Sequence, residues 1–147
     1  MRRIVVGTDG SDTATQAVRE AAVLAAQLGA ALEVVSAYTP VSRQRLREEA
    51  RQTPADQQWM VTPREDVDAK LEDARAVAAS IGVAEIALHA REGDPADAIL
   101  DVAEEREGDL IVVGNKGMSG ARRFLLGSVP NKISHHAPCS VLIVRTS

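Results

Sequence analysis

The chain has 147 residues, close to the commonest size of one domain, so we expect a single domain over residues 1–147. Its formal charge of −4 contains no block of like charges, which argues against a nucleic-acid-binding or membrane-surface protein. A single cysteine excludes an internal disulfide, and no apolar run is long enough for a membrane span or a signal peptide, so we expect a cytoplasmic protein.

Aromatic residues make up only 2% of the chain, so the core must be built from Val, Ile, Leu and Ala. That composition suits parallel strands buried on both faces by Ala-rich helices. The β-branched run Ile4–Val6 predicts a buried strand, and a polar, glycine-containing turn follows it. Alanines at helical spacing then predict a helix from about Asp12 to Leu28, with Gly29 as its stop.

A second strand is predicted at Leu32–Tyr38. The polar connection over residues 39–63 that follows is long for a compact domain, and such connections are usually functional or mobile. Within it, residues 43–52 are compatible with a short surface helix. An apolar stripe from Val67 to Ile81 then predicts a helix that begins at Pro63 and ends before Gly82.

The alternation of strands and helices continues to the end of the chain. A third strand is predicted at Ala84–Arg91. Asp94-Pro95 predicts a helix start, because Asp caps helices and Pro suits the first helical position, and Gly108 closes that helix. The remaining predicted elements are a strand at Asp109–Gly114, a helix from Val129 to about His136 and a strand at Ser140–Arg145.

Strands that alternate with helices imply a parallel sheet with right-handed crossovers, and we expect a doubly wound, Rossmann-like α/β domain. Ligands bind such sheets at the carboxyl ends of the strands, beside the point where the strand order reverses. Three segments end there with unusual residues: Gly7–Asp9, Ser36–Tyr38 and Gly114–Gly117. The first and fourth strands are the natural neighbours at that point.

The strongest functional signal is the glycine-rich loop between Gly114 and Ser128. Glycines let backbone N–H groups approach a ligand closely, and a loop of such amides forms a concavity for anions. The loop leads into the helix at Val129-Pro130, whose free N–H groups and dipole attract phosphate. These glycines alone could simply shape a loop, but their place between a buried strand and a helix favours phosphate binding. The loop matches neither the P-loop nor the dinucleotide-binding fingerprint.

The spacing within this loop resembles that of a known family. Gly114-x-x-Gly117, nine further residues and then Gly127-Ser128 resemble the G-2x-G-9x-G-S/T signature of the ATP-binding branch of the universal stress proteins. The resemblance runs from end to end of the chain, through the motifs Val6–Ser11, Gly93–Ala96, Asp109–Gly114, Gly127–Lys132 and Ala137–Val144.

The resemblance implies a five-stranded parallel sheet of order 3-2-1-4-5 and a site for an adenine nucleotide. It implies that Gly7 and Thr8 line the base and that Asp9 meets the ribose. The backbone of Ala37 would hydrogen-bond the adenine edge, and Gly114 would lie under the ribose. The phosphates would be held by Gly117, Gly127, Ser128 and Val129.

The resemblance also implies a role and a ligand: a regulatory protein of the stress response that holds ATP or AMP, with Mg²⁺ as a possible companion. Members usually form homodimers by pairing their last strands, a role that Val141 to Val144 would take. Gly114-Asn115 resembles some actinobacterial relatives that bind cyclic AMP, which is therefore the alternative ligand. Further alternatives are a slow ATPase and a homodimeric interaction module with a vestigial pocket. The sequence offers no general base for phosphoryl transfer, so no catalytic residue is assigned.

Several charged residues have both a functional and a structural interpretation. Asp9 suits a ribose hydroxyl or Mg²⁺, or a cap of the first helix, and no other metal ligand is predicted. Lys116, Arg122 and Arg123 either reach phosphate or form a solvated charged face. For three residues near the C-terminus the structural interpretation is preferred. His135 and His136 suit the negative end of a helix dipole, and Cys139 suits the apolar core.

Overall fold

The computed structural model describes residues 1–38, 63–115 and 128–145. The predicted long connection and the predicted helix over 43–52 lie outside these ranges. In chain order the described elements are β1 (Arg3–Gly7), α1 (Asp12–Leu28), β2 (Ala31–Tyr38), α3 (Pro63–Ile81), β3 (Ile86–Glu92), α4 (Pro95–Glu105), β4 (Leu110–Gly114), α5 (Ser128–His136) and β5 (Ser140–Val144).

The strands form one five-stranded parallel sheet of order β3-β2-β1-β4-β5, which confirms the predicted α/β fold class and strand order. β1 lies at the centre of the sheet. Its Val6 is the partner of Val34 in β2 on one side and of Val112 in β4 on the other. The chain order of the strands therefore reverses between β1 and β4, as the resemblance implied.

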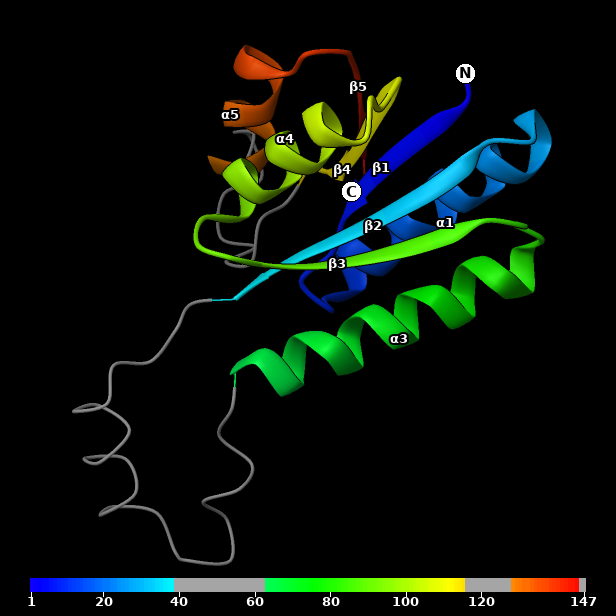
Figure 1. Ribbon diagram of the computed structural model, residues 1–147, viewed down its shortest axis with the longest axis horizontal. Helices are drawn as coiled ribbons and strands as arrows, with labels where there is room; N and C mark the ends of the chain where they lie inside the picture. The colour runs from blue at the N-terminus through cyan, green and yellow to red at the C-terminus, as the bar shows by residue number, and fades with distance from the viewer. Residues whose placement is uncertain (39–62, 116–127, 146–147) are drawn as a thin grey trace, which may run out of the picture.

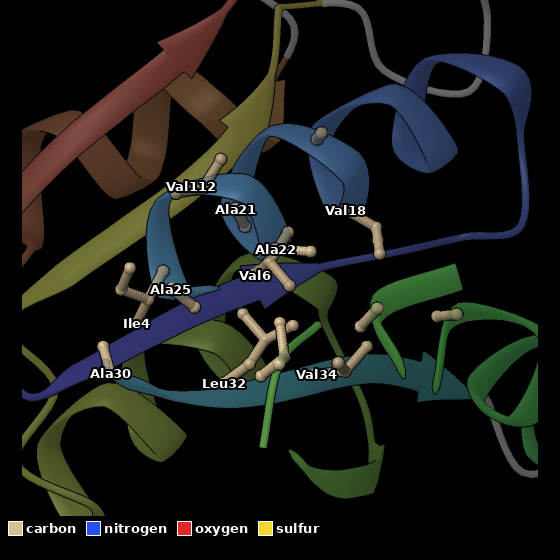
Figure 2. Close-up of a cluster of buried hydrophobic side chains, with 14 of the residues drawn as sticks. Ile4, Val6, Val18, Ala21, Ala22, Ala25, Ala30, Leu32, Val34 and Val112 are labelled. Carbon is tan, nitrogen blue, oxygen red and sulfur yellow. The ribbon is translucent and has the colours of Figure 1, made fainter. Parts of the chain in front are cut away.

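Helices cover both faces of this sheet (Figure 1). On one face α1 and α3 pack, and Figure 2 shows Val18 and Ala21 of α1 against Val6 and Leu32 of the strands. On the other face α4 and α5 enclose a second cluster, centred on buried side chains such as Ile99. The small alanines of α1 let this helix lie close to the β-branched strands, so a core with few aromatic residues still fills its space.

The predicted helix boundaries have identifiable caps. The side chain of Ser11 accepts a hydrogen bond from the backbone of the first turn of α1, and Gly29 ends that helix in the left-handed conformation, with φ of 65°. Asp94 caps α4 by accepting a hydrogen bond of 3.0 Å from the backbone N–H of Asp97, and Pro95 takes the first helical position as predicted.

The end of α4 differs from the prediction. The helix ends at Glu105, and the left-handed residue that follows is Glu107, with φ of 54°, rather than Gly108. Gly108 is needed for a different reason, because a Cβ at this position would lie 2.8 Å from Cγ2 of Val5. β3 also begins at Ile86, later than the predicted start at Ala84.

A buried carboxylate fastens the far end of α4 to the sheet. Glu33 in β2 is only 1% exposed, yet it carries a charge that two arginines share. Arg106, at the C-terminus of α4, donates to Oε1 of Glu33, and Arg3 of β1 donates to the same oxygen over 3.0 Å. Burial raises the pKa of Glu33, but these two hydrogen bonds outweigh it and hold the pKa below its usual range.

His89 of β3 completes this cluster from the edge of the sheet. Its Nε2 lies 3.6 Å from Oε2 of Glu33, is buried, and has no hydrogen-bond partner within the described residues. Burial lowers the pKa of His89, and the positive charges of Arg91 and Arg106 act in the same direction, although the Glu33 carboxylate opposes them. His89 is therefore neutral at neutral pH.

This burial predicts that the protein loses stability on mild acidification. The unfolded chain, with a histidine pKa of about 6.5, takes up the proton before the folded chain does, so the free energy of unfolding falls as pH drops through that value. We expect the decrease between about pH 7 and about pH 5.5 to be shallower in His89→Gln than in the parent, measured by urea unfolding.

Between about pH 7 and about pH 5.5 the Glu33 carboxylate of this cluster does not change its protonation. The lowered pKa of Glu33 places loss of its contribution below about pH 4.5, outside the window. An equally steep decrease in His89→Gln and in the parent would contradict the assignment.

Candidate functional site

A cavity of about 90 Å³ opens at the carboxyl ends of β1, β2 and β4, between α1, α4 and α5. This is the place where the strand order reverses, so the location agrees with the expectation for a doubly wound sheet. The lining is mostly small or apolar and consists of Gly7, Thr8, Asp9, Ser11, Thr13, Ala14, Val35, Ala37, Pro95, Ile99, Val113, Gly114, Val129 and Pro130.

The turn from β1 into α1 is held by its own side chains. Thr8 donates its backbone N–H to the carbonyl of Val35 over 2.9 Å, which fixes the turn against β2. Oδ1 of Asp9 accepts the backbone N–H of Ser11 over 2.8 Å, while Ser11 in turn caps α1. Asp9 is thus not the cap of the first helix, and its carboxylate stands beside the cavity, with one oxygen used to fix the turn.

β2 extends beyond the end of β1, and this leaves backbone groups facing the cavity. The bonds from Ala31 N–H to Arg2 and from Thr8 N–H to Val35 show that the odd-numbered residues of β2 direct their N–H and C=O toward β1. Ala37 is the next odd-numbered residue and has no partner in β1, whose last residue Gly7 pairs with Val35. The N–H and C=O of Ala37 therefore point into the space that β1 no longer fills.

Two glycines keep the walls of the cavity close together. A Cβ at Gly7 would lie 2.3 Å from Cδ1 of Ile99, and a Cβ at Gly114 would lie 2.7 Å from Cγ2 of Thr13. At Gly114 the added atom would also come within 3.4 Å of the Thr13 carbonyl oxygen. Glycine at the end of β4 therefore allows the first turn of α1 to approach the strand closely.

Two helices begin at the cavity. α4 contributes Pro95 and Ile99 from its first turns, and α5 contributes Val129 and Pro130. The first N–H groups of a helix have no partner inside the helix, and its N-terminus is the positive end of the dipole, so the start of α5 favours a negative charge on this side of the cavity. Ser128 is the first residue of α5 and is exposed, but it does not line the cavity.

Six of the predicted ligand-binding residues line this one cavity: Gly7, Thr8, Asp9, Ala37, Gly114 and Val129. Gly117 and Gly127 lie outside the described residues, as do Lys116, Arg122 and Arg123. The structure thus brings residues of three strand ends and one helix together. Their role as ligand contacts, and that of Ser128, stays a prediction.

Several lining residues are not among the predicted site residues. Ile99 lies within the helix predicted from Asp94-Pro95, one turn after its start, and that place could have suggested a wall of the cavity. Thr13 and Val35 carry no motif, so only the three-dimensional approach of α1 and β2 reveals them.

The other residues near the C-terminus take structural positions. His135 and His136 lie in the last turn of α5, where positive groups suit the dipole. Cys139 packs at the edge of the second core cluster, and burial raises the pKa of its thiol. Within the described ranges, no three His, Cys, Asp or Glu residues are grouped so that they could hold a metal ion.

Comparison with known proteins gives concordant matches over almost the whole chain. Residues 1–145 match the universal stress protein family. The chain is 38% identical over 148 residues to universal stress protein Rv1636 of Mycobacterium tuberculosis, covering 99% of this chain and 97% of that protein. It is 33% identical over 150 residues to universal stress protein MJ0531 of Methanocaldococcus jannaschii, covering 98% and 82%.

Solved structures agree with these matches. A universal stress protein in complex with cAMP is 35% identical and superposes with a TM-score of 0.75, covering 99% of this chain and 98% of that one. A universal stress protein from Archaeoglobus fulgidus in complex with dAMP is 26% identical, with a TM-score of 0.70 and coverage of 97% for both chains.

No helix in the described part of the chain combines the length and apolar character that crossing a bilayer requires. The match over residues 1–145, the strand order and the full-length relatives agree with one another. The chain belongs to the universal stress protein family.

Proposed function

We propose that this protein binds an adenine nucleotide in the cavity at the carboxyl ends of β1, β2 and β4. The observation that carries the proposal is the backbone of Ala37, whose N–H and C=O face the cavity beyond the end of β1. One donor and one acceptor side by side suit the edge of adenine, and the apolar side chains of Val35 and Ile99 suit its ring faces. Two related proteins were solved with the adenine nucleotides cAMP and dAMP, which supports this ligand class.

In this proposal the ribose lies between the first and fourth strands. Asp9 uses Oδ1 to fix the turn, and its Oδ2 accepts a ribose hydroxyl. Gly7 and Thr8 line the base, and Gly114 lies under the sugar because no side chain intervenes there.

The phosphates extend toward the N-terminus of α5. We propose that Ser128 and Val129, together with Gly117 and Gly127 of the loop, donate hydrogen bonds to them. The helix dipole adds an attraction of about 0.3–1 kcal/mol at an exposed site. No residue is proposed to act as a catalyst, and occupancy of the site is proposed to change the surface that the protein presents to partners in a cytoplasmic stress response.

Two ligands fit this description, and each has its own support. ATP with Mg²⁺ fits the glycine spacing of the loop, which resembles the ATP-binding branch of the family. Cyclic AMP fits Asn115 after Gly114, and the relative solved with cAMP is 35% identical over nearly the full chain. The two differ in the number of phosphates that the α5 end of the site must hold.

Isothermal titration calorimetry of the nucleotide-free protein, with ATP–Mg²⁺ and cyclic AMP side by side, tests the proposal. Tighter binding of ATP would indicate a loop that holds a polyphosphate, and AMP would then serve as the shorter comparison. Tighter binding of cyclic AMP would indicate a site for a single phosphate. Binding of none of these nucleotides would overturn the proposal and favour an interaction module with a vestigial pocket.

Filling the cavity should weaken nucleotide binding without unfolding the protein. Ala37→Leu adds a branched side chain next to Ile99, and we expect the affinity for every adenine nucleotide to fall at least about tenfold, or about 1.4 kcal/mol. Ala37→Ser keeps the small side chain and the same backbone, so its affinity should stay within about twofold of the parent. Equal affinity in Ala37→Leu and in the parent would place the ligand elsewhere.

We also propose that the protein is a homodimer that pairs β5 strands of two copies. β5 lies at the edge of the sheet, so β4 is its one neighbour among the described strands. An edge strand presents free backbone groups to a second chain. Leu142, in the middle of the Val141 to Val144 segment, is 38% exposed and is therefore accessible to a second copy.

A charge on this edge should separate the copies. The parent is expected to have twice the 15.6 kDa mass of one chain in light scattering after size-exclusion chromatography. Leu142→Lys is expected to have the mass of one chain, because lysine on an edge strand disfavours strand pairing. A parent that elutes as a monomer would contradict the proposed dimer.

A further inference from the structure

We propose that Lys132 favours anionic ligands in the cavity, by offsetting part of the negative charge of two carboxylates beside its wall at Pro95. Lys132 lies in α5 and does not line the cavity, so it is a positioning residue that acts through Asp94 and Asp97 of the α4 N-terminus. The inference rests on the proposed nucleotide site and deepens it, because it names the group that lets a phosphate approach this side of the site.

The contacts of Lys132 join the two helices that begin at the cavity. Its Nζ lies 2.8 Å from Oδ1 of Asp97 and 3.4 Å from Oδ2 of Asp94. Asp94 precedes Pro95, and Lys132 follows Pro130 by two positions in the same helix, and both prolines line the cavity. A single ammonium group therefore bridges α4 and α5 next to the proposed phosphate end.

Asp94 stays ionised at neutral pH. Oδ2 of Asp94 accepts the backbone N–H of Asp97 over 3.0 Å as the cap of α4, and this bond, with that from Lys132, lowers the pKa of Asp94. The same contacts raise the pKa of Lys132, first through Asp97 and then through Asp94. Asp94 and Lys132 are thus both charged at neutral pH.

Without the ammonium group these carboxylates would oppose a phosphate. Consecutive Cα atoms are about 3.8 Å apart, so Asp94 lies within a few ångströms of the cavity wall at Pro95. That is well inside the Debye length of about 10 Å at 0.1 M salt. Lys132 also lies four residues after Ser128, so both occupy the same face of α5, one turn apart.

Lys132→Met tests the proposal, because methionine keeps the length and helix propensity of the side chain and removes the charge. We expect the affinity for a nucleotide that the parent binds, ATP–Mg²⁺ or cyclic AMP, to fall about three- to tenfold in calorimetry at low salt. The affinity for adenosine, which has no phosphate, should stay within about twofold, and Lys132→Arg should restore nucleotide binding.

A second variant separates charge from helix packing. In the triple variant Lys132→Met, Asp94→Asn, Asp97→Asn the carboxylates are gone, while asparagine still caps α4. We expect nucleotide affinity to return to within about twofold of the parent. The matched control is Arg75→Met, which breaks the exposed pair between Arg75 and Glu72 on α3, away from the cavity, and should leave affinity unchanged.

Three results of these titrations would each contradict one part of the proposal. Parental nucleotide affinity in Lys132→Met, or a loss that the triple variant does not restore, would overturn the role of Lys132. An equal loss for adenosine and nucleotide, with a lowered melting temperature, would do the same, because it would assign Lys132 to helix packing alone. If the parent itself binds no nucleotide, the proposed function fails first, and that failure is visible before any variant is made.

Discussion

The reversal of strand order at β1 is the constraint on which the rest of this structure depends. β1 pairs with β2 on one side and with β4 on the other, and right-handed crossovers that run in opposite directions must place their helices on opposite faces of the sheet. The chain after β1 therefore leaves toward α1, and the chain after β4 leaves toward α5 (Figure 1). The cavity lies between the end of β1 and the end of β4, where the chain turns to opposite faces of the sheet.

Small side chains decide how that space is used. β2 continues past the end of β1, so Ala37 presents main-chain groups where another strand would otherwise pair. Glycine at the ends of β1 and β4 lets Ile99 and Thr13 come close and keeps the opening narrow. The same backbone that builds the sheet thus supplies the polar groups of the candidate site, with few specialised side chains.

Much of this arrangement could be predicted from the sequence, because its signals are local. Helical spacing in α1, the cap at Asp94 and the β-branched run of β1 each identify an element within a few residues. Contacts between distant residues could not be predicted in this way. Glu33 and Arg106 are 73 positions apart, and neither belongs to a motif. The left-handed turn at Glu107 was missed because glycine, the usual residue for it, stands one position later and serves packing against Val5.

The attachment of α4 has a consequence for how such a protein can change over evolutionary time. The helix is fastened at its C-terminal end, where Arg106 meets the buried Glu33 and Glu105 meets Arg91 over 2.6 Å. Its opposite end provides the wall at Ile99. The contacts that stabilise α4 thus lie at its C-terminal end, and the residues that line the cavity lie in its N-terminal half. Substitutions at residues that face the cavity would leave the contacts that anchor the helix in place.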